Sequence, residues 1–331
     1  MSRNYKIIPD FKFTSGPYKF VPIRDADKFK IMNWRNDQMY HLRQKEKLNR
    51  RSQEKYFKEI IDPLFEENLP KQLLFSILKE DNLVAYGGLV HIDWESRVSE
   101  LSLVMDTELE AMFFEEIWIA FLGFSKHFAF RKLALEKIYT YAFDIRPKLY
   151  KPLEQSGFIL EARLVHHILI NNIYYDVLIH SFINPKKGFS IEKIQSNDKE
   201  QLLTWANEAN VRKFSIQTDK ITKEEHNSWF ESKMKNSDCK IYIGRNVLGN
   251  NLGQIRLELK KRQWNIDYSV DYSIRGLGIG KMLVKKALER HPNIPLLAIV
   301  KKENIASIKI FENLGFKKLE EENQIKFTLN E

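Results

Sequence analysis

The sequence predicts an α/β protein made of two similar domains in tandem. Its 331 residues allow two domains at about 150 residues each. Alternating, strand-like stretches are interspersed with amphipathic helical stretches in both halves, which excludes an all-helical bundle. The two halves also resemble each other, so we expect one fold to occur twice.

The repeat is clearest at the two ends of each copy. Near its start, each copy passes from a strand-like stretch into a helix that carries Trp34-Arg35-Asn36 in the first copy and Trp205-Ala206-Asn207 in the second. Near its end, EQSGFILEARL in the first copy corresponds to ENLGFKKLEEE in the second. The boundary is expected at Asn184-Pro185-Lys186-Lys187-Gly188, because proline and glycine follow a strand-like run there. The predicted domains are therefore residues 1–184 and 185–331.

The order of elements is easiest to assign in the second copy. We expect three successive strands, a helix, an apolar strand and a last helix, at Cys239–Arg245, Leu252–Leu259, Gln263–Val270, Gly280–Arg290, Pro295–Val300 and Asn304–Asn313.

Composition excludes several classes of protein. The longest uncharged apolar run has nine residues, 117–125, whereas a membrane-spanning helix needs about 20. Charges are scattered over the first 13 residues, so we expect no signal peptide and a cytoplasmic protein. The single cysteine, Cys239, rules out an internal disulfide and a cysteine-rich metal cluster, and we expect no metal. The net charge of +9 favours anionic partners, but no basic tail is present, so nucleic acid is not expected.

The most specific motif follows a predicted strand and opens a helix. It reads Arg275-Gly276-Leu277-Gly278-Ile279-Gly280, with Lys281 directly after it. Three glycines let the backbone approach a ligand and turn its N–H groups inward, and the start of the helix adds positive charge. The pattern therefore predicts a pyrophosphate site, to which Arg275 and Lys281 add charge. The spacing differs from the G-x-G-x-x-G dinucleotide fingerprint, and the GK[ST] of a nucleoside-triphosphate loop is missing.

A second pattern, NIASIKIFENLGF, starts about 24 residues after this loop. Together the two segments resemble the GNAT superfamily of N-acyltransferases, whose motifs are R/Q-x-x-G-x-G/A and N-x-x-A/S-x-x-x-Y-x-x-x-G-F. The resemblance implies a mixed, mostly antiparallel sheet flanked by helices (α+β) in each domain, and acyl-CoA as cosubstrate. It implies a CoA site formed by Val270, Arg275, Gly276, Leu277, Gly278, Ile279, Gly280, Lys281, Asn304, Ser307 and Phe311. Phe311 departs from the pattern, because many members have a tyrosine there that protonates the leaving thiolate.

The first copy is more altered. Its strand SELSLVMD resembles the strand before the loop, and Glu100 lies where relatives often keep a carboxylate. The segment TELEAMFFEE, residues 107–116, is expected to be a loop with no glycine and four carboxylates, which would repel a pyrophosphate. We therefore expect the first domain to cover the cleft of the second, to help form the acceptor pocket where the domains meet, or to form a homodimer.

The acceptor is predicted from a further resemblance. The stretches Trp205–Arg212 and Ile221–Phe230 resemble N-acyltransferases that act on nucleotide-linked amino-dideoxy sugars for surface glycans such as lipopolysaccharide or capsule. This implies substrate contacts by Trp205, Asn207, Arg212 and Trp229. It favours a dTDP-3-amino-3,6-dideoxyhexose over a UDP-4-amino sugar, and acetyl or a short hydroxyacyl such as 3-hydroxybutanoyl as the group transferred. A protein or aminoacyl N-acetyltransferase, or a non-catalytic module that binds CoA or nucleic acid, are the alternatives.

The reaction needs a neutral amine. If the amine has a pKa near 8, about a tenth is neutral at pH 7, so deprotonation costs only about 1.4 kcal/mol. A weak base suffices, and the candidates are Asp267 on the strand before the loop and His226 in a predicted helix. Backbone N–H groups after Val270 are an alternative source of catalysis, since they could polarise the thioester carbonyl without any side chain.

Overall fold

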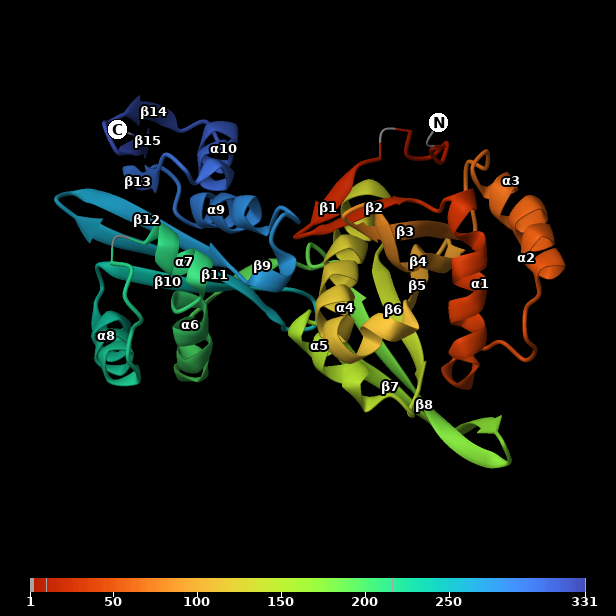
Figure 1. Ribbon diagram of the computed structural model, residues 1–331. Helices are drawn as coiled ribbons and strands as arrows, with labels where there is room; N and C mark the ends of the chain where they lie inside the picture. The colour runs from red at the N-terminus through yellow and green to blue at the C-terminus, as the bar shows by residue number, and fades with distance from the viewer. Residues whose placement is uncertain (1–2, 10, 216, 331) are drawn as a thin grey trace. The chain divides into compact units, whose positions relative to one another are not determined.

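The computed structural model describes residues 3–9, 11–215 and 217–330. The chain divides into two compact units, Met1–Asn184 (unit 1) and Pro185–Glu331 (unit 2). Each unit contains one sheet with helices on its faces (Figure 1).

Unit 1 has a sheet of eight strands, ordered β1-β2-β3-β4-β5-β6-β8-β7 in the described ranges. The strands are β1 (Phe13–Ser15), β2 (Tyr18–Pro22), β3 (Leu73–Lys79), β4 (Asn82–Asp93), β5 (Val98–Met105), β6 (Lys137–Phe143), β7 (Ile159–Ile170) and β8 (Ile173–Ile183). The helices are α1 (Lys28–Asp37), α2 (Arg50–Tyr56), α3 (Asp62–Leu64), α4 (Glu110–His127) and α5 (Tyr150–Gln155). Shorter helical turns are η1 (Asp25–Asp27), η2 (Met39–His41), η3 (Phe57–Ile61), η4 (Thr107–Leu109), η5 (Phe128–Lys132) and η6 (Pro147–Leu149).

Unit 2 has a sheet of seven strands, ordered β14-β15-β13-β12-β11-β10-β9 in the described ranges. The strands are β9 (Ser190–Lys193), β10 (Cys239–Arg245), β11 (Asn251–Lys260), β12 (Gln263–Val270), β13 (Leu296–Lys301), β14 (Lys317–Glu320) and β15 (Gln324–Leu329). The helices are α6 (Lys199–Ala206), α7 (Ala209–Phe214), α8 (Lys223–Lys235), α9 (Ile279–Arg290) and α10 (Ile305–Asn313), with the turns η7 (Ser196–Asp198) and η8 (Tyr272–Ile274).

The two sheets share one pattern of pairing. Neighbouring strands are antiparallel except for one parallel pair in each sheet, β5 with β6 and β12 with β13. In unit 2 the parallel pairing covers only Trp264 with Leu296 and Asn265 with Leu297. The rest of β12 has no partner on that side in the described residues, so the two strands diverge there; the region between their unpaired parts is called the slot below. The predicted class, a mixed and mostly antiparallel sheet flanked by helices in each of two tandem domains, is confirmed.

The sequence repeat is also a structural repeat. In unit 1 the Asn36 amide bonds both the N–H and the carbonyl of Leu48 at 2.8 Å. Asn207 makes the same two bonds with Ile221 in unit 2, also at 2.8 Å. Gly157 and Gly315, which follow α5 and α10, both have a φ of +80°. Only glycine adopts this left-handed conformation without strain, so both copies need it where the helix ends.

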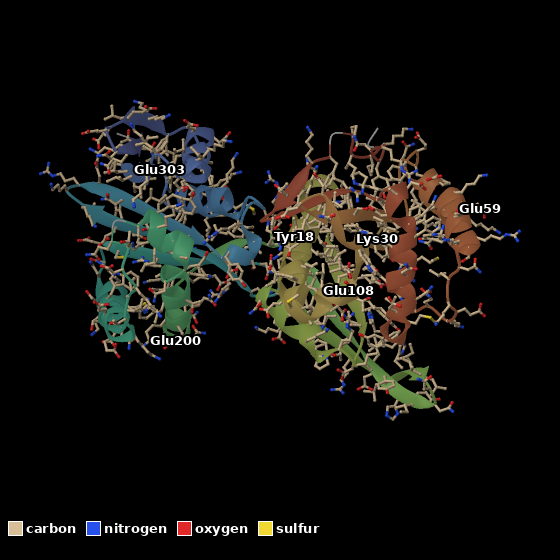
Figure 2. The ribbon with its side chains drawn as sticks, in the orientation of Figure 1. Tyr18, Lys30, Glu59, Glu108, Glu200 and Glu303 are labelled. Carbon is tan, nitrogen blue, oxygen red and sulfur yellow. The ribbon has the colours of Figure 1, made fainter. Side chains whose placement is uncertain are left out.

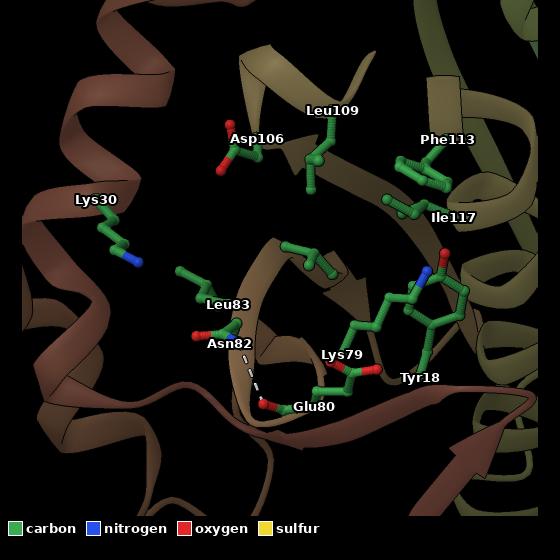
Figure 3. A pocket seen from close by; sticks show the side chains of 11 residues that line it. Tyr18, Lys30, Lys79, Glu80, Asn82, Leu83, Asp106, Leu109, Phe113 and Ile117 are labelled. Carbon is green, nitrogen blue, oxygen red and sulfur yellow. Dashed lines mark hydrogen bonds between the residues drawn. The ribbon is translucent and has the colours of Figure 1, made fainter. Parts of the chain in front are cut away.

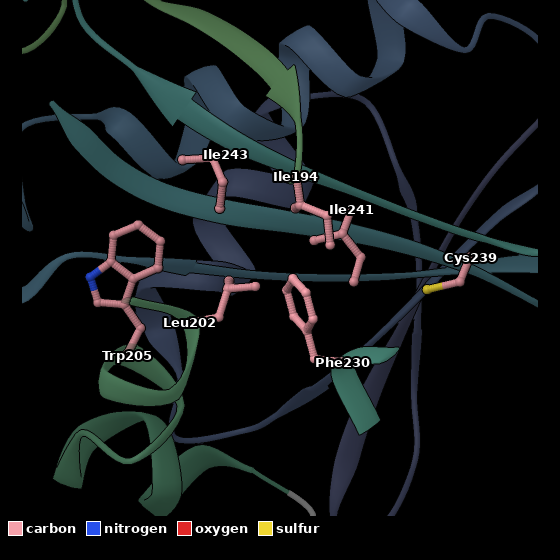
Figure 4. Packing of buried hydrophobic residues seen from close by; sticks show 7 residues of the cluster. All are labelled: Ile194, Leu202, Trp205, Phe230, Cys239, Ile241 and Ile243. Atoms are coloured by element: carbon pink, nitrogen blue, oxygen red, sulfur yellow. The ribbon is translucent and has the colours of Figure 1, made fainter. Parts of the chain in front are cut away.

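Helices cover both faces of the unit 2 sheet, with α6 and α8 on one side and α9 and α10 on the other (Figure 1). On the α6 and α8 side, an apolar cluster holds these helices against the sheet (Figure 4). Its buried members are Ile194, Leu202, Trp205, Phe230, Cys239, Ile241 and Ile243. The period-two alternation of β10 places Cys239, Ile241 and Ile243 on this face.

Charged side chains lie mainly outside. Those of Glu59 and Glu200 are 57% and 64% exposed and extend from the surface (Figure 2). Within the described residues, no helix combines the length and the apolar character that crossing a bilayer requires. The same residues contain no group of three or more His, Cys, Asp or Glu placed to hold a metal ion.

One prediction about unit 1 is wrong. The segment 107–116 is not a loop, because η4 follows β5 directly and α4 begins at Glu110. The Asp106 carboxylate accepts from the Glu108 N–H at 3.0 Å and starts the turn. Without glycine, and with acidic residues favoured in a first helical turn, the chain continues straight into the helix.

Candidate active site

The loop between β12 and α9 is held by alternating apolar residues. Ile274, Leu277 and Ile279 are buried, with 3%, 2% and 1% of their surface exposed. Between them, Gly276 and Gly278 have φ angles of +76° and +91°. Side chains at these two positions would strain the backbone. The buried side chains thus anchor the loop, and the two glycines bring no side chain of their own to it.

The start of α9 is open to an anion. Gly278 is the N-cap residue, and no side chain in the described part of the chain caps the helix there. The first N–H groups of α9 therefore lack an intrahelical partner and carry the positive end of the helix dipole. Lys281 is exposed in this first turn. A Cβ on Gly278 would meet only the flexible end of the Lys186 side chain, at 3.6 Å. A ligand therefore has room to approach the backbone of the loop at Gly278. These features fit a pyrophosphate.

Arg275 braces the loop. Its Nε donates to the Val270 carbonyl at 3.0 Å, and its Nη2 pairs with the Glu208 carboxylate at 2.6 Å. The guanidinium is thus engaged at both ends, and Glu208 offsets much of its charge. Arg275 therefore orders the bend, whereas Lys281 is the exposed cation of the same segment.

The segment from α6 to α7 reaches both diverging strands. Trp205 Nε1 donates to the Asp271 carboxylate at 2.8 Å, directly after β12. At the other side of the slot, Lys301 Nζ at the end of β13 donates to the Lys213 carbonyl at 3.0 Å. This segment therefore spans the slot, from the residue after β12 to the end of β13.

The α9 and α10 side of the slot carries a pair of hydroxyl groups. Tyr268 on β12 and Ser307 in the first turn of α10 are hydrogen-bonded, with 2.8 Å between their oxygens. The Asn304 side chain accepts from the Ser307 N–H at 3.2 Å and caps α10. Burial raises the pKa of Tyr268 to about 12. Sequence analysis missed Tyr268, although the alternation along β12 places it on the face opposite Asp267.

Phe311 lies in the core of unit 2. It is 2% exposed, and its ring centroid is 5.0 Å from Phe316 and 5.4 Å from Phe327. The ring packs edge-on against Tyr268 at 6.0 Å. Phe311 therefore supports the wall of the slot and brings no polar group to it.

The two candidate bases share the α6 and α8 side of the sheet but differ in environment. Asp267 has a 55% exposed side chain and pairs with Arg256 at 3.3 Å. His226 on α8 is 3% exposed, and its two ring nitrogens have no hydrogen-bond partner in the described residues. Desolvation lowers the pKa of His226, so its ring is neutral at pH 7. Trp229 packs beside it, with 5.4 Å between the ring centroids.

Two predicted substrate contacts organise the segment that follows α7. The amide of Asn207 bonds both backbone groups of Ile221, as described above. The Arg212 guanidinium donates to the carbonyls of Gln217 and Asp219 at 3.3 and 3.4 Å. Both side chains thereby fix the loop between α7 and α8, and this loop borders the segment that spans the slot.

Comparison with known families decides the assignment of the fold. Two family models match, each described as an acetyltransferase (GNAT) domain, over residues 21–179 and 189–317. The chain is a tandem of two GNAT domains. GNAT acetyltransferases use acyl-CoA as cosubstrate, and the loop before α9 in the second GNAT domain has the features that its pyrophosphate requires.

Individual relatives match about half of the tandem. An uncharacterized protein of Methanocaldococcus jannaschii is 30% identical over 178 residues, which make up 50% of this chain and 37% of that protein. The crystal structure of a domain from the same organism is 28% identical, covers 43% of this chain and 98% of its own, and has a TM-score of 0.39. The spermidine N-acetyltransferase of Vibrio cholerae, solved in complex with CoA and spermine, is 20% identical, covers 51% and 96%, and has a TM-score of 0.46.

The first GNAT domain lacks the loop. In the second domain, Arg275–Gly278 separate η8 from α9, whereas in the first domain α4 follows η4 with no residue between. Glu110, in the first turn of α4, pairs with Arg146 and with Lys148, the latter at 3.1 Å. Arg146 lies eleven residues before Gly157, as Asn304 lies eleven before Gly315. Side chains of the first domain thus form an ion pair where the second domain presents bare backbone.

The first domain has a cavity of about 340 Å³ elsewhere, at the turn between β3 and β4 (Figure 3). Its lining includes Lys30 and Lys79, but also Glu80 and Asp106. Because carboxylates accompany both lysines, the cavity does not select for an anion.

Proposed function

We propose that the chain is an acyl-CoA-dependent N-acyltransferase whose acceptor is the amine of a nucleotide-linked amino sugar. The observation that carries the acyl-CoA part is the loop before α9, with two left-handed glycines, an uncapped helix start and an exposed Lys281. These N–H groups would hold the CoA pyrophosphate. The unpaired part of β12, ending at Val270, would bond the amides of the pantetheine arm.

The choice of an anionic acceptor rests on charge. The chain carries a net charge of +9, and the segment that spans the slot includes Arg212 and Lys213. A polyamine would be repelled by these cations, whereas a nucleoside diphosphate would be attracted. Glu208, the nearby carboxylate of this segment, is already paired with Arg275. A dTDP-3-amino-3,6-dideoxyhexose is favoured over a UDP-4-amino sugar by the resemblance of Trp205–Arg212 to enzymes that use it.

The residues of the second domain would act mainly by positioning. Holding an amine against a thioester in register can supply about 7–11 kcal/mol. Trp205 and Trp229 would border the acceptor, and Asn207 and Arg212 would keep the neighbouring loop in place. His226, neutral through burial, or Asp267 would take the proton that the amine loses.

The decisive test is CoA release by the full chain with a panel of amines. The panel contains dTDP-3-amino and UDP-4-amino sugars, spermidine and a peptide with a free N-terminus, each with acetyl-CoA and 3-hydroxybutanoyl-CoA. We expect kcat/KM to be at least 100-fold higher for a nucleotide sugar than for spermidine or the peptide. A preference for the peptide would support a protein N-acetyltransferase instead. CoA binding without turnover of any amine, or salt-dependent DNA binding, would identify a binding module.

A further inference from the structure

Arg35, near the end of α1, is a cation with no acidic partner. Its side chain is partly buried. The Nε atom donates to the Gln44 side chain at 3.0 Å, and Nη1 donates to the Tyr86 hydroxyl at 2.8 Å. Both partners are uncharged, and no carboxylate in the described ranges forms an ion pair with the guanidinium. Because an unpaired charge is costly to bury, this environment favours an anion that comes from outside the chain.

The repeat places an alanine where Arg35 stands. Trp34-Arg35-Asn36 in the first GNAT domain corresponds to Trp205-Ala206-Asn207 in the second. The two tryptophans are both buried, at 6% and 2% exposure. The two asparagines make the same pair of backbone bonds. The flanking residues therefore keep one structural role in both domains, and the shared fold does not require the guanidinium.

Two further cations surround His41, which follows α1 in η2. Arg146 Nη1 donates to His41 Nε2 at 2.8 Å. Burial, followed by the charges of Arg146, Lys148 and Arg35, lowers the pKa of His41 to about 3. The neutral ring thus lies among three cations, which we call the cationic cluster: Arg35, Arg146 and Lys148.

The cationic cluster holds more charge than the chain neutralises. Glu110 pairs with both Arg146 and Lys148, so one carboxylate serves three cations. The excess of two positive charges is close to the charge of a phosphate monoester, about −2 at neutral pH. Lys148 is 47% exposed, so solvent reaches the cluster. Arg146 Nε is buried and has no hydrogen-bond partner in the part of the chain that the structure describes, so the donors of the cluster are not all used within the chain.

The cationic cluster lies at one end of the first sheet. Gln38 Nε2, directly after α1, donates to the carbonyl of Met105, the last residue of β5, at 2.8 Å. Arg146, which is bonded to His41, lies three residues after the end of β6. The parallel pairing of β5 with β6 covers only the first three residues of each strand. The segment from α1 to η2 therefore connects the ends of two strands that no longer pair.

Tyr40 adds an aromatic surface beside the cluster. It is 50% exposed, and its ring packs edge-on against His41, with 4.7 Å between the centroids. An exposed ring next to excess positive charge fits a phosphate that is attached to a base. We propose that Arg35, Arg146 and Lys148 form a binding site for the phosphate groups of a nucleotide in the first GNAT domain. Guanidinium groups suit this ligand, because they donate to phosphate through two nitrogens. The site goes beyond the proposed acyl transfer and does not depend on it.

Titration calorimetry of the full chain tests the site. The chain is saturated with CoA, so that the loop before α9 is filled, and is titrated with dTDP or with inorganic phosphate. We expect dTDP to bind, and Arg35→Met to weaken this binding at least tenfold, because a hydrogen bond to a charged group contributes that much. Absence of dTDP binding, displacement of dTDP by CoA, or an unchanged affinity in Arg35→Met would overturn the proposal. Inorganic phosphate that binds as tightly as dTDP would overturn the nucleotide part of it.

The matched control is Arg97→Met, which removes the same charge from the same domain. Arg97 is 59% exposed and directly precedes β5, whereas Tyr86 is paired with Val104, about 23 Å further along that strand. This variant should change the dTDP affinity less than twofold, and a loss equal to that of Arg35→Met would contradict a specific site. If Arg35→Met does not fold, Arg35→Lys should still bind dTDP at least threefold more weakly, because lysine keeps the charge without the planar pair of donors. The titration needs no turnover, so its result is separate from that of the amine panel.

Discussion

Replacing Gly278 with glutamate tests the phosphate loop most directly. The change puts a carboxylate at the uncapped start of α9, in a residue with a φ of +91°. A left-handed backbone costs a non-glycine residue about 1–2 kcal/mol, which lowers the melting temperature of a domain of this size by about 3 °C per kcal/mol. A carboxylate about 5 Å from one phosphate charge adds about 3 kcal/mol of repulsion at an effective dielectric constant near 20, or a loss of affinity of about 100-fold.

The control is Gly249→Glu, in the turn between β10 and β11. Gly249 has a φ of +77°, and a Cβ there would meet nothing within 4 Å. The two variants therefore share the backbone cost and the added charge, and differ in distance from the loop. Titration calorimetry with CoA should show the 100-fold loss for Gly278→Glu and less than a twofold change for Gly249→Glu. Equal affinities in two folded variants would refute the assignment of the loop.

Three further outcomes are expected. Calorimetry should give one CoA per chain, and two CoA per chain would contradict the expected loss of the site in the first domain. Glu110→Gln should leave CoA affinity unchanged. It should lower the free energy of unfolding by about 3 kcal/mol, because Arg146 stays buried without its main partner. Burial, with the Arg146 guanidinium beside it, lowers the pKa of His41 to about 3, so His41 stays neutral in the folded state while the unfolded state takes up a proton below about pH 6.5. Stability is therefore lost as the pH falls, by at most about 2 kcal/mol between pH 7.5 and 5.0, and urea unfolding of His41→Gln should show a smaller loss. If His226 is the base, kcat/KM of the wild type should fall as the pH drops below 6.5, because burial lowers the pKa of His226. His226→Gln should remove this fall, whereas Asp267→Asn should retain it.

The local parts of the site could be predicted from the sequence, and the long-range parts could not. The glycine spacing and the strand before it specify the loop, because turn chemistry and alternation act over a few residues. The partner of Arg275 is Glu208, 67 residues earlier, and no local pattern indicates that this carboxylate neutralises the guanidinium. The burial of His226 depends likewise on the packing of α8 against the sheet. The helix at Glu110 differs from the prediction for another reason, because segment 107–116 has none of the glycines that form the loop of its counterpart in the second domain.

The two GNAT domains differ at the start of the helix that follows the strand and its helical turn. Removing four residues of the loop would leave a helix start with unsatisfied N–H groups, which costs free energy when it is covered. In the first domain the Asp106 carboxylate accepts from Glu108, and Glu110 places a negative charge in the first turn of α4. Arg146 then pairs with Glu110, so this first turn already carries an acidic side chain with a cationic partner. We therefore expect the first domain to bind no CoA, because a pyrophosphate at this helix start would meet the Glu110 carboxylate.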